Sequence, residues 1–112
     1  MSANILSINV DQAGGTTASL IAAVAGYRVV VVGFCLAVGE AAITVESTLQ
    51  DITANTVRMT LVGNATTPVV YSYSGSKQAP AFITALDEGL ELVTGTASAI
   101  RGFINYTREP GA

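Results

Sequence analysis

The amino-acid sequence predicts an all-β protein, a single compact antiparallel β-sandwich of about eight strands. Turn-forming residues recur about every ten residues, which is the spacing of short strands in a sandwich or barrel. Between the turns, apolar and polar residues alternate along several runs, as in strands that bury one face. The length of 112 residues fits one domain with its own core.

Two strands are expected ahead of the longest apolar run. Residues 5–10 alternate and end at the flexible sequence Asp-Gln-Ala-Gly-Gly of residues 11–15. Residues 17–24 form the second expected strand. A tight turn at Ala25 and Gly26 follows, because glycine readily takes the positive φ that such turns need.

Residues 27–38 form the longest expected strand, and they are apolar on both faces. Simple alternation places Val29, Val31 and Cys35 on one face. The opposite face then carries Val30, Val32, Phe34, Leu36 and Val38. A sandwich strand normally keeps one polar face, so the second apolar face suggests cover by another subunit.

Three further strands are expected in the middle of the chain, at residues 41–47, 57–62 and 69–73. The first places Ile43 and Val45 inward, and a polar loop at 50–56 follows it. The second has inward positions at Val57, Met59 and Leu61. In the third, Tyr71 and Tyr73 share one face.

The last third of the chain is expected to hold strands at residues 81–85, 90–93 and 97–106. The final strand buries Ile100, Ile104 and Tyr106 and leaves Arg101 and Phe103 on the opposite face. A helix over 79–92 is the alternative for this region, because Phe82, Leu86 and Leu90 are spaced four apart. Gly89 weakens the end of such a helix.

These elements divide the chain into three parts. Residues 1–18 are expected to form an N-terminal strand or arm, able to extend from the domain. Residues 19–107 form the sandwich. Residues 108–112 are a C-terminal tail that frays.

The composition excludes several classes of partner. Only 12% of the residues are charged, about half the usual share, and the net charge is −3. The five Lys and Arg residues are scattered singly, so neither nucleic acid nor a polybasic membrane attachment is expected. The amino terminus lacks the pattern of a signal peptide, which predicts synthesis in a cytoplasm. A surface with little charge favours association with other subunits.

A membrane protein that spans with residues 20–45 is a hypothesis from another class. This segment is strongly apolar, and a spanning helix needs about 20 such residues. Arg28 and Glu40 interrupt it, and the β-branched residues 29–32 favour a strand instead.

No motif in the sequence predicts an enzyme, a cofactor or a metal site. Residues 74–77 match the Ser-x-x-Lys pattern of serine acyl-transferring enzymes, but the companion motifs are missing and a loop is expected. Asp87, Glu88 and Glu91 form a carboxylate cluster that is expected to lie in a solvated turn. Cys35 has no histidine to activate it.

The order of features from Leu20 onward resembles that of small β-sandwich structural proteins of tailed bacteriophages. The resemblance rests on residues 20–29 leading into the apolar strand, on Ile43-Thr44-Val45, on residues 88–92, and on a closing strand that ends with residues 102–106. It implies a jelly-roll or tumour-necrosis-factor-like sandwich. The family includes capsid decoration (cement) proteins, often trimers, and tail or fibre domains.

The resemblance therefore implies a non-enzymatic virion structural protein on the capsid surface. The expected role is that of a cement protein, which forms a homo-oligomer, with a trimer as the expected form, and stabilises the phage head by binding the major capsid protein or another virion protein. The alternative is a tail-tip or fibre module that binds a host receptor or glycan. The residues expected to contact a subunit or partner are Val29, Val31, Arg101, Phe103, Tyr71 and Tyr73.

Overall fold

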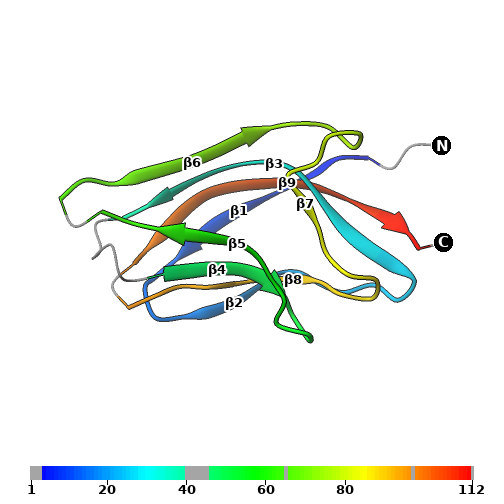
Figure 1. The fold of residues 1–112 in the computed structure, drawn as a ribbon, viewed down its shortest axis with the longest axis horizontal. Coiled ribbons are helices and arrows are strands. Elements are labelled where there is room, and N and C mark those ends of the chain that lie inside the picture. Colours follow the sequence, from blue (N-terminus) through cyan, green and yellow to red (C-terminus); the bar gives the residue numbers. More distant parts are fainter. Residues whose placement is uncertain (1–3, 40–45, 65, 97, 112) are drawn as a thin grey trace.

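The chain folds into two antiparallel sheets that pack face to face (Figure 1). The computed structural model describes residues 4–39, 46–64, 66–96 and 98–111. The strands are β1 (Leu6–Gln12), β2 (Thr17–Ile21), β3 (Tyr27–Val38), β4 (Glu46–Asp51), β5 (Val57–Val62), β6 (Val69–Ser74), β7 (Phe82–Ile83), β8 (Leu90–Val93) and β9 (Ile100–Pro110). Sheet A has the order β1-β9-β3-β6, with β7 also beside β3, and sheet B has the order β2-β8-β4-β5. The predicted all-β sandwich is confirmed.

The strand pairing is nested, which is the topology of a jelly roll. The outermost strands pair as β1 with β9, the next as β2 with β8, then β3 with β6, and the innermost as β4 with β5. A long antiparallel hairpin that wraps around one core produces this nesting. The first and last strands of the sandwich therefore lie side by side in sheet A.

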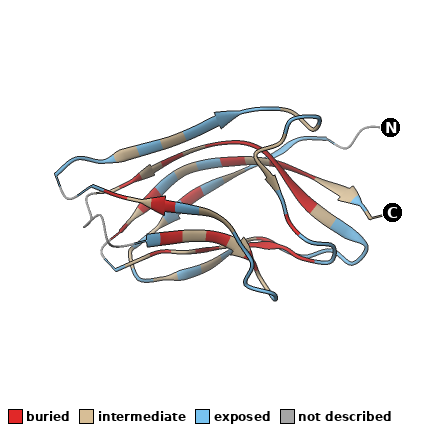
Figure 2. Ribbon diagram, in the orientation of Figure 1, coloured by how far each residue is buried: buried red, intermediate tan, exposed pale blue. Residues whose placement is uncertain are grey.

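The core lies between the two sheets, where strands of both contribute fully buried aliphatic side chains (Figure 2). Sheet B supplies Leu49, Leu61, Leu90 and Leu92, each 0% exposed. In sheet A, alternate residues of β9 face the core. Ile100, Ile104 and Tyr106 of this strand are buried, as the sequence predicted. Arg101 and Phe103 point to the opposite, exposed side, also as predicted.

A β-bulge changes the two faces of β3 from those that simple alternation predicts. The pairing of β3 with β9 shifts register between Val31 and Gly33. One extra residue on the bulged strand exchanges the faces beyond it. The core side of β3 therefore carries Val29, Val31, Phe34, Leu36 and Val38 together, and the predicted separation of the first two from the last three is wrong.

The outer side of β3 is covered in part by the chain itself. Val30 and Val32 are outside the core cluster, yet each is only 3% exposed in the single chain. Val30 pairs with Ile83 of β7 on one side and with Thr107 of β9 on the other. Another subunit is not needed to cover these two valines, which corrects the reason first given for subunit cover.

Several predicted boundaries shift in the structure. β1 pairs with β9 along seven positions, so residues 6–12 belong to the sandwich rather than to a separate arm. β9 continues to Pro110, so the first residues of the expected tail are paired as well. Pairing between the two chain ends holds both in place, which the sequence of either end alone does not reveal.

The middle of the chain also differs from the expectation. β4 spans Glu46–Asp51, later than the strand expected at 41–47, and Ile43 and Val45 lie outside the described residues. Val57 was expected to point inward, but it is 50% exposed at the start of the edge strand β5. The helix considered for 79–92 is not formed, because β7 and β8 occupy this segment. The strand expected at 90–93 is confirmed as β8.

Candidate interaction surfaces

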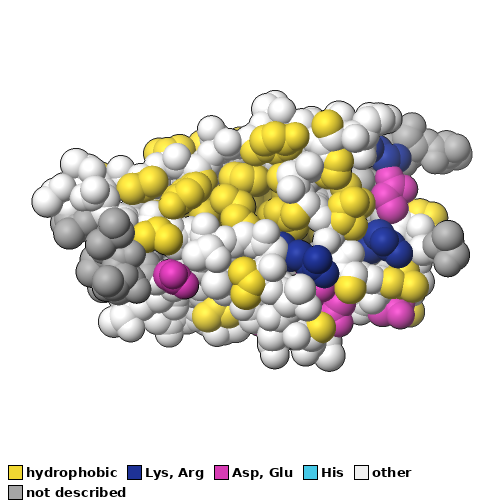
Figure 3. Space-filling model, viewed as in Figure 1, with side chains coloured by type: hydrophobic (Ala, Val, Ile, Leu, Met, Phe, Trp, Pro, Cys, Tyr) yellow, Lys and Arg dark blue, Asp and Glu magenta, His cyan; other side chains and the backbone are white. Residues whose placement is uncertain are grey.

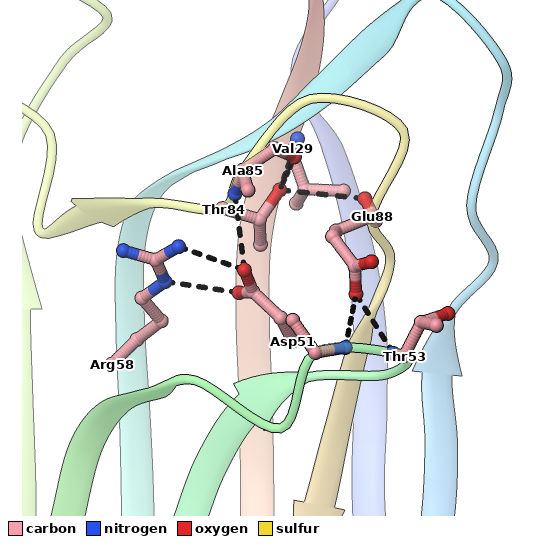
Figure 4. A network of polar contacts seen from close by, with 8 residues as sticks. Val29, Asp51, Thr53, Arg58, Thr84, Ala85 and Glu88 are labelled. Atoms are coloured by element: carbon pink, nitrogen blue, oxygen red, sulfur yellow. Dashed lines mark hydrogen bonds and ion pairs between the residues drawn. The ribbon is translucent and has the colours of Figure 1, made fainter.

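A polar network closes one end of the sandwich and centres on the fully buried Asp51 of β4 (Figure 4). Arg58 donates two hydrogen bonds to its carboxylate, from Nε at 2.9 Å and from Nη2 at 2.7 Å. The backbone N–H of Ala85 donates a third at 3.1 Å. The hydrogen bond and the negative charge of Asp51 raise the pKa of Arg58 above its usual value. The network ties the segment after β7 to the β4–β5 hairpin.

Glu88 and Thr84 extend the same network, and their contacts are structural. The Glu88 carboxylate accepts hydrogen bonds from the backbone N–H groups of Thr53 and Ala54, at 2.8 and 3.3 Å. The buried Thr84 hydroxyl accepts one from the N–H of Val29 at 2.9 Å and donates to the Glu88 carbonyl at 3.3 Å. Buried polar groups with such partners stabilise loops.

The other residues of the predicted carboxylate cluster have different partners. Asp87 accepts a hydrogen bond from the N–H of Gly26, and Glu91 accepts one from the side-chain amide of Gln50 at 2.8 Å. The structure therefore distributes the three acids among separate hydrogen-bond partners. Among the described residues, no group of three or more potential ligands could hold a metal ion.

The Ser-x-x-Lys segment starts at Ser74, the last residue of β6, and continues into the loop between β6 and β7. Within the loop, Ser76 Oγ accepts a hydrogen bond from the N–H of Ala79 at 3.3 Å. The Lys77 ammonium lies 2.8 Å from Glu109 of β9. Ser76 thus supports a turn and Lys77 ties the loop to the last strand, so residues 75–77 form the predicted loop while Ser74 belongs to a strand.

An apolar groove opens between β5 of sheet B and the β6–β7 edge of sheet A. Its volume is about 370 Å³, and its lining includes Arg58, Met59, Phe34, Tyr71, Tyr73 and Phe82. Figure 3 shows hydrophobic side chains gathered along this face, over β6, β5 and β7. We call this feature the β5–β6 groove.

Both predicted tyrosines lie at this groove, in different roles. The Tyr71 hydroxyl bridges the two sheets, because it accepts a hydrogen bond from the N–H of Val62 at 3.0 Å and donates one to its carbonyl at 2.8 Å. Tyr73 is 39% exposed, packs beside Phe34 with ring centroids 6.3 Å apart, and donates to the Ala79 carbonyl. Tyr73 offers the more accessible ring.

A second surface is the solvent-facing side of sheet A, here called the outer face. Residues directly opposite in an antiparallel ladder share a face, so the printed registers define three rows across β6, β3, β9 and β1. The rows are Ser74-Gly33-Asn105-Ser7, Ser72-Cys35-Phe103-Asn9 and Val70-Ala37-Arg101-Asp11. Small residues along β3 leave a shallow hollow of about 400 Å³ beside Phe103, Cys35 and Ile5.

The outer face carries little charge and two prominent apolar side chains. Phe103 is 40% exposed and Val70 is 61% exposed. Within the three rows the charges are those of Arg101 and Asp11, whose side chains pair at 3.1 Å and are both well exposed. Cys35 is half-buried and belongs to this face, whereas simple alternation placed it on the same face as Val29 and Val31.

Two of the six predicted contact residues are misplaced. Val29 and Val31 are 1% and 0% exposed and pack between the sheets, so they have no surface to offer a partner. The bulge in β3 is the reason, since it puts them on the core side. Arg101 and Phe103 lie on the outer face, and Tyr71 and Tyr73 line the groove. The structure therefore places these four residues as two pairs on two different surfaces.

The sequence did not point to the other residues that line the groove beside these tyrosines. Arg58 and Met59 come from β5, and Phe82 comes from β7. The exposed Ile5 beside the hollow was also missed. Spacing along the chain carries no signal for such neighbours, because they depend on which strands form the edges of the two sheets.

Within the described residues, no helix is long and apolar enough to span a membrane. Residues 27–38 of the segment considered for such a span form β3. Comparisons of the chain with family models, with curated proteins and with solved structures find no match.

Proposed function

We propose that this chain is a non-enzymatic structural subunit that works by assembly, as a capsid decoration (cement) protein of a tailed bacteriophage. The outer face of sheet A is the observation that carries this proposal. It is broad, contains one exposed ion pair in its three rows, and displays Phe103 and Val70. Exposed apolar area of this kind marks protein interaction surfaces.

The proposed assembly is a homotrimer formed through the outer face and bound at the capsid surface. Burial of apolar surface contributes about 25 cal/mol per Å², and cyclic symmetry lets each copy bury the same patch. Contacts of a trimer with the major capsid protein, repeated over the particle, add avidity to weak individual contacts. No cofactor is required by this mechanism.

Light scattering coupled to size exclusion tests the oligomer. A mass of about 34 kDa, three times 11.4 kDa, supports the trimer, and Phe103→Glu is expected to abolish it. Thr17→Glu is the matched control, because Thr17 is exposed in β2 of sheet B, away from the outer face. A wild-type monomer at micromolar concentration contradicts trimerisation in solution.

The location in purified particles tests the role. Gold-labelled antibody on the head, with hundreds of copies per particle by quantitative mass spectrometry, supports the cement function. A few copies at the tail tip support the alternative, a host-recognition module. The accessible Tyr73 ring in the β5–β6 groove favours that alternative, since exposed aromatic rings stack on sugars. Absence from particles contradicts both.

A further inference from the structure

The backbone edge of β6 is a feature of sheet A separate from its outer face. β6 pairs with β3 on one side and, among the described residues, is the last strand at that edge of sheet A. Its sequence, Val-Val-Tyr-Ser-Tyr-Ser, contains no charged residue. Soluble proteins usually protect such an edge with lysine, proline within the strand or a bulge. β6 has none of these, and its register with β3 is regular over six residues.

The direction of the free backbone groups follows from the ladder. The N–H of Gly75 donates to the Val32 carbonyl at 2.9 Å, which continues the register in which Ser74 lies opposite Gly33. Hydrogen-bonded and non-hydrogen-bonded pairs alternate in an antiparallel ladder. Tyr73 and Tyr71 therefore direct their backbone groups toward β3, and Val70, Ser72 and Ser74 direct theirs away from it. These three residues are exposed.

We propose that β6 pairs with β6 of a second copy of this chain, antiparallel, around a two-fold axis at Ser72. In this register Ser72 lies opposite Ser72 of the second copy, and Val70 lies opposite its Ser74. Each of the three outward-directed positions then makes two N–H···O bonds across the edge. The strand is self-complementary, which is what an isologous two-fold contact requires.

The groove supplies the apolar part of the contact. The β5–β6 groove opens at the same edge, and Tyr71 and Tyr73 of β6 belong to its lining. In the proposed register Tyr71 lies opposite Tyr73 of the second copy, as a closely spaced non-hydrogen-bonded pair. The two grooves thus meet, and the hydrophobic band seen in Figure 3 becomes continuous with its copy. Sheet A of one molecule continues into sheet A of the other.

Site-specific cross-linking tests this register directly. The protein carries Cys35→Ser, Phe103→Glu to remove the proposed trimer, and Ser72→Cys. The probe is a short bifunctional maleimide added to the full-length protein. Cysteines on the axis lie within about 5.5 Å, the Cα separation of a hydrogen-bonded pair. We expect rapid formation of a covalent dimer. Thr17→Cys in place of Ser72→Cys is the control, because Thr17 is exposed in β2 of sheet B and is expected to link slowly.

A charge at the axis tests the energetics. In the Phe103→Glu background, which removes the proposed trimer, Ser72→Lys places two like charges opposite each other, and this destabilises a cross-strand pair. We expect the dissociation constant of the two-fold contact to rise by about tenfold or more, with an unchanged melting temperature at a concentration where the protein is monomeric. Thr17→Lys, on the exposed surface of sheet B, is expected to leave the mass unchanged.

The outcomes separate this contact from the proposed trimer. Two-fold pairing alone gives twice the 11.4 kDa of one chain, and pairing combined with the trimer gives six times that mass. Equal cross-linking of the Ser72→Cys and Thr17→Cys proteins in the Phe103→Glu background overturns the two-fold contact. The two-fold contact is also overturned if Ser72→Lys abolishes binding to particles while the Ser72→Cys protein forms no cross-link. In that case the edge of β6 pairs with an extended segment of another virion protein.

Discussion

The inner and outer faces of sheet A are built from the same strands and differ in composition, packing and tolerance of change. The inner face carries Val31, Leu36 and Ile104, each 0% exposed, against the leucines of sheet B. The outer face carries Gly33, Cys35 and Ala37 along the same strand β3, with Phe103 exposed beside them. One strand thus serves the core on one side and an interaction surface on the other.

An apolar strand face therefore does not by itself mark a subunit contact. From Gly33 to Val38 both sides of β3 are apolar, yet the side with the larger side chains is core, and the side with the small ones is open. Packing explains this division, because large aliphatic residues fill the space between two sheets. Small residues on the outer side leave a shallow surface that a partner side chain can enter.

The largest predicted difference in stability is between a charge placed on the inner face of sheet A and the same charge placed on its outer face. Val31→Asp buries an unpaired carboxylate between the sheets, which costs several kcal/mol, comparable with the whole stability of a small domain. We expect insoluble or unfolded protein by circular dichroism. Asn9→Asp adds the same charge to the outer face and is expected to melt within a few degrees of wild type. A soluble Val31→Asp protein with a normal melting curve contradicts the assigned core.

Gly102→Ala tests how closely β9 and β3 approach within sheet A. Gly102 has φ +150°, and an added Cβ meets the carbonyl oxygen of Cys35 and the Cα of Leu36. We expect a loss of about 2–4 kcal/mol from overpacking and backbone strain together, measured by urea unfolding. Gly26→Ala is the control, since it has φ +81° but open space around it, and should cost about 1–2 kcal/mol. Equal losses for the two variants refute the close approach.

Tyr71→Phe tests the one hydroxyl that joins the edges of the two sheets across the groove. Its removal takes two hydrogen bonds from Val62, and we expect a loss of about 1–2 kcal/mol. Tyr73→Phe removes a single, exposed hydrogen bond to Ala79 and should cost at most about half as much. The comparison is made by thermal unfolding of both variants. A larger loss for Tyr73→Phe speaks against the bridging role of Tyr71.

Phe103→Ala has the smallest predicted effect on the fold and the most informative effect on assembly. The side chain is 40% exposed on the outer face, so its removal should destabilise the monomer by only about 1 kcal/mol. We expect the trimer to dissociate at micromolar concentration in light scattering. A variant that keeps the trimer shows that the outer face is not the trimer contact.

Much of the fold could be predicted because its signals are local. Alternation in β9 correctly separated Ile100, Ile104 and Tyr106 from Arg101 and Phe103, and the strand at 90–93 was found with its exact bounds. Turn residues located most of the remaining strands. The candidate contacts were predicted less well, because Val29 and Val31 belong to a strand whose alternation breaks at a bulge.

The polar network around Asp51 is a second feature that the sequence alone does not predict. The sequence shows an aspartate seven residues before an arginine, at the turn between two strands, and nothing there reveals a fully buried pair. Burial of Asp51 depends on Ala85 and the segment after β7, which fold over the β4–β5 hairpin. Contacts between residues so far apart in the chain leave no periodic pattern.

The amino-acid sequence is enough to predict the all-β class and the alternation of most strands, and it shows the low charge and no complete catalytic motif. Only the folded chain shows which side of β3 is core, which strands are edges and where the groove opens. Alternation can be predicted because it arises from the pleat of a single strand. A bulge, a sheet edge and a groove instead arise from pairing with strands distant in sequence, whose register no single strand contains.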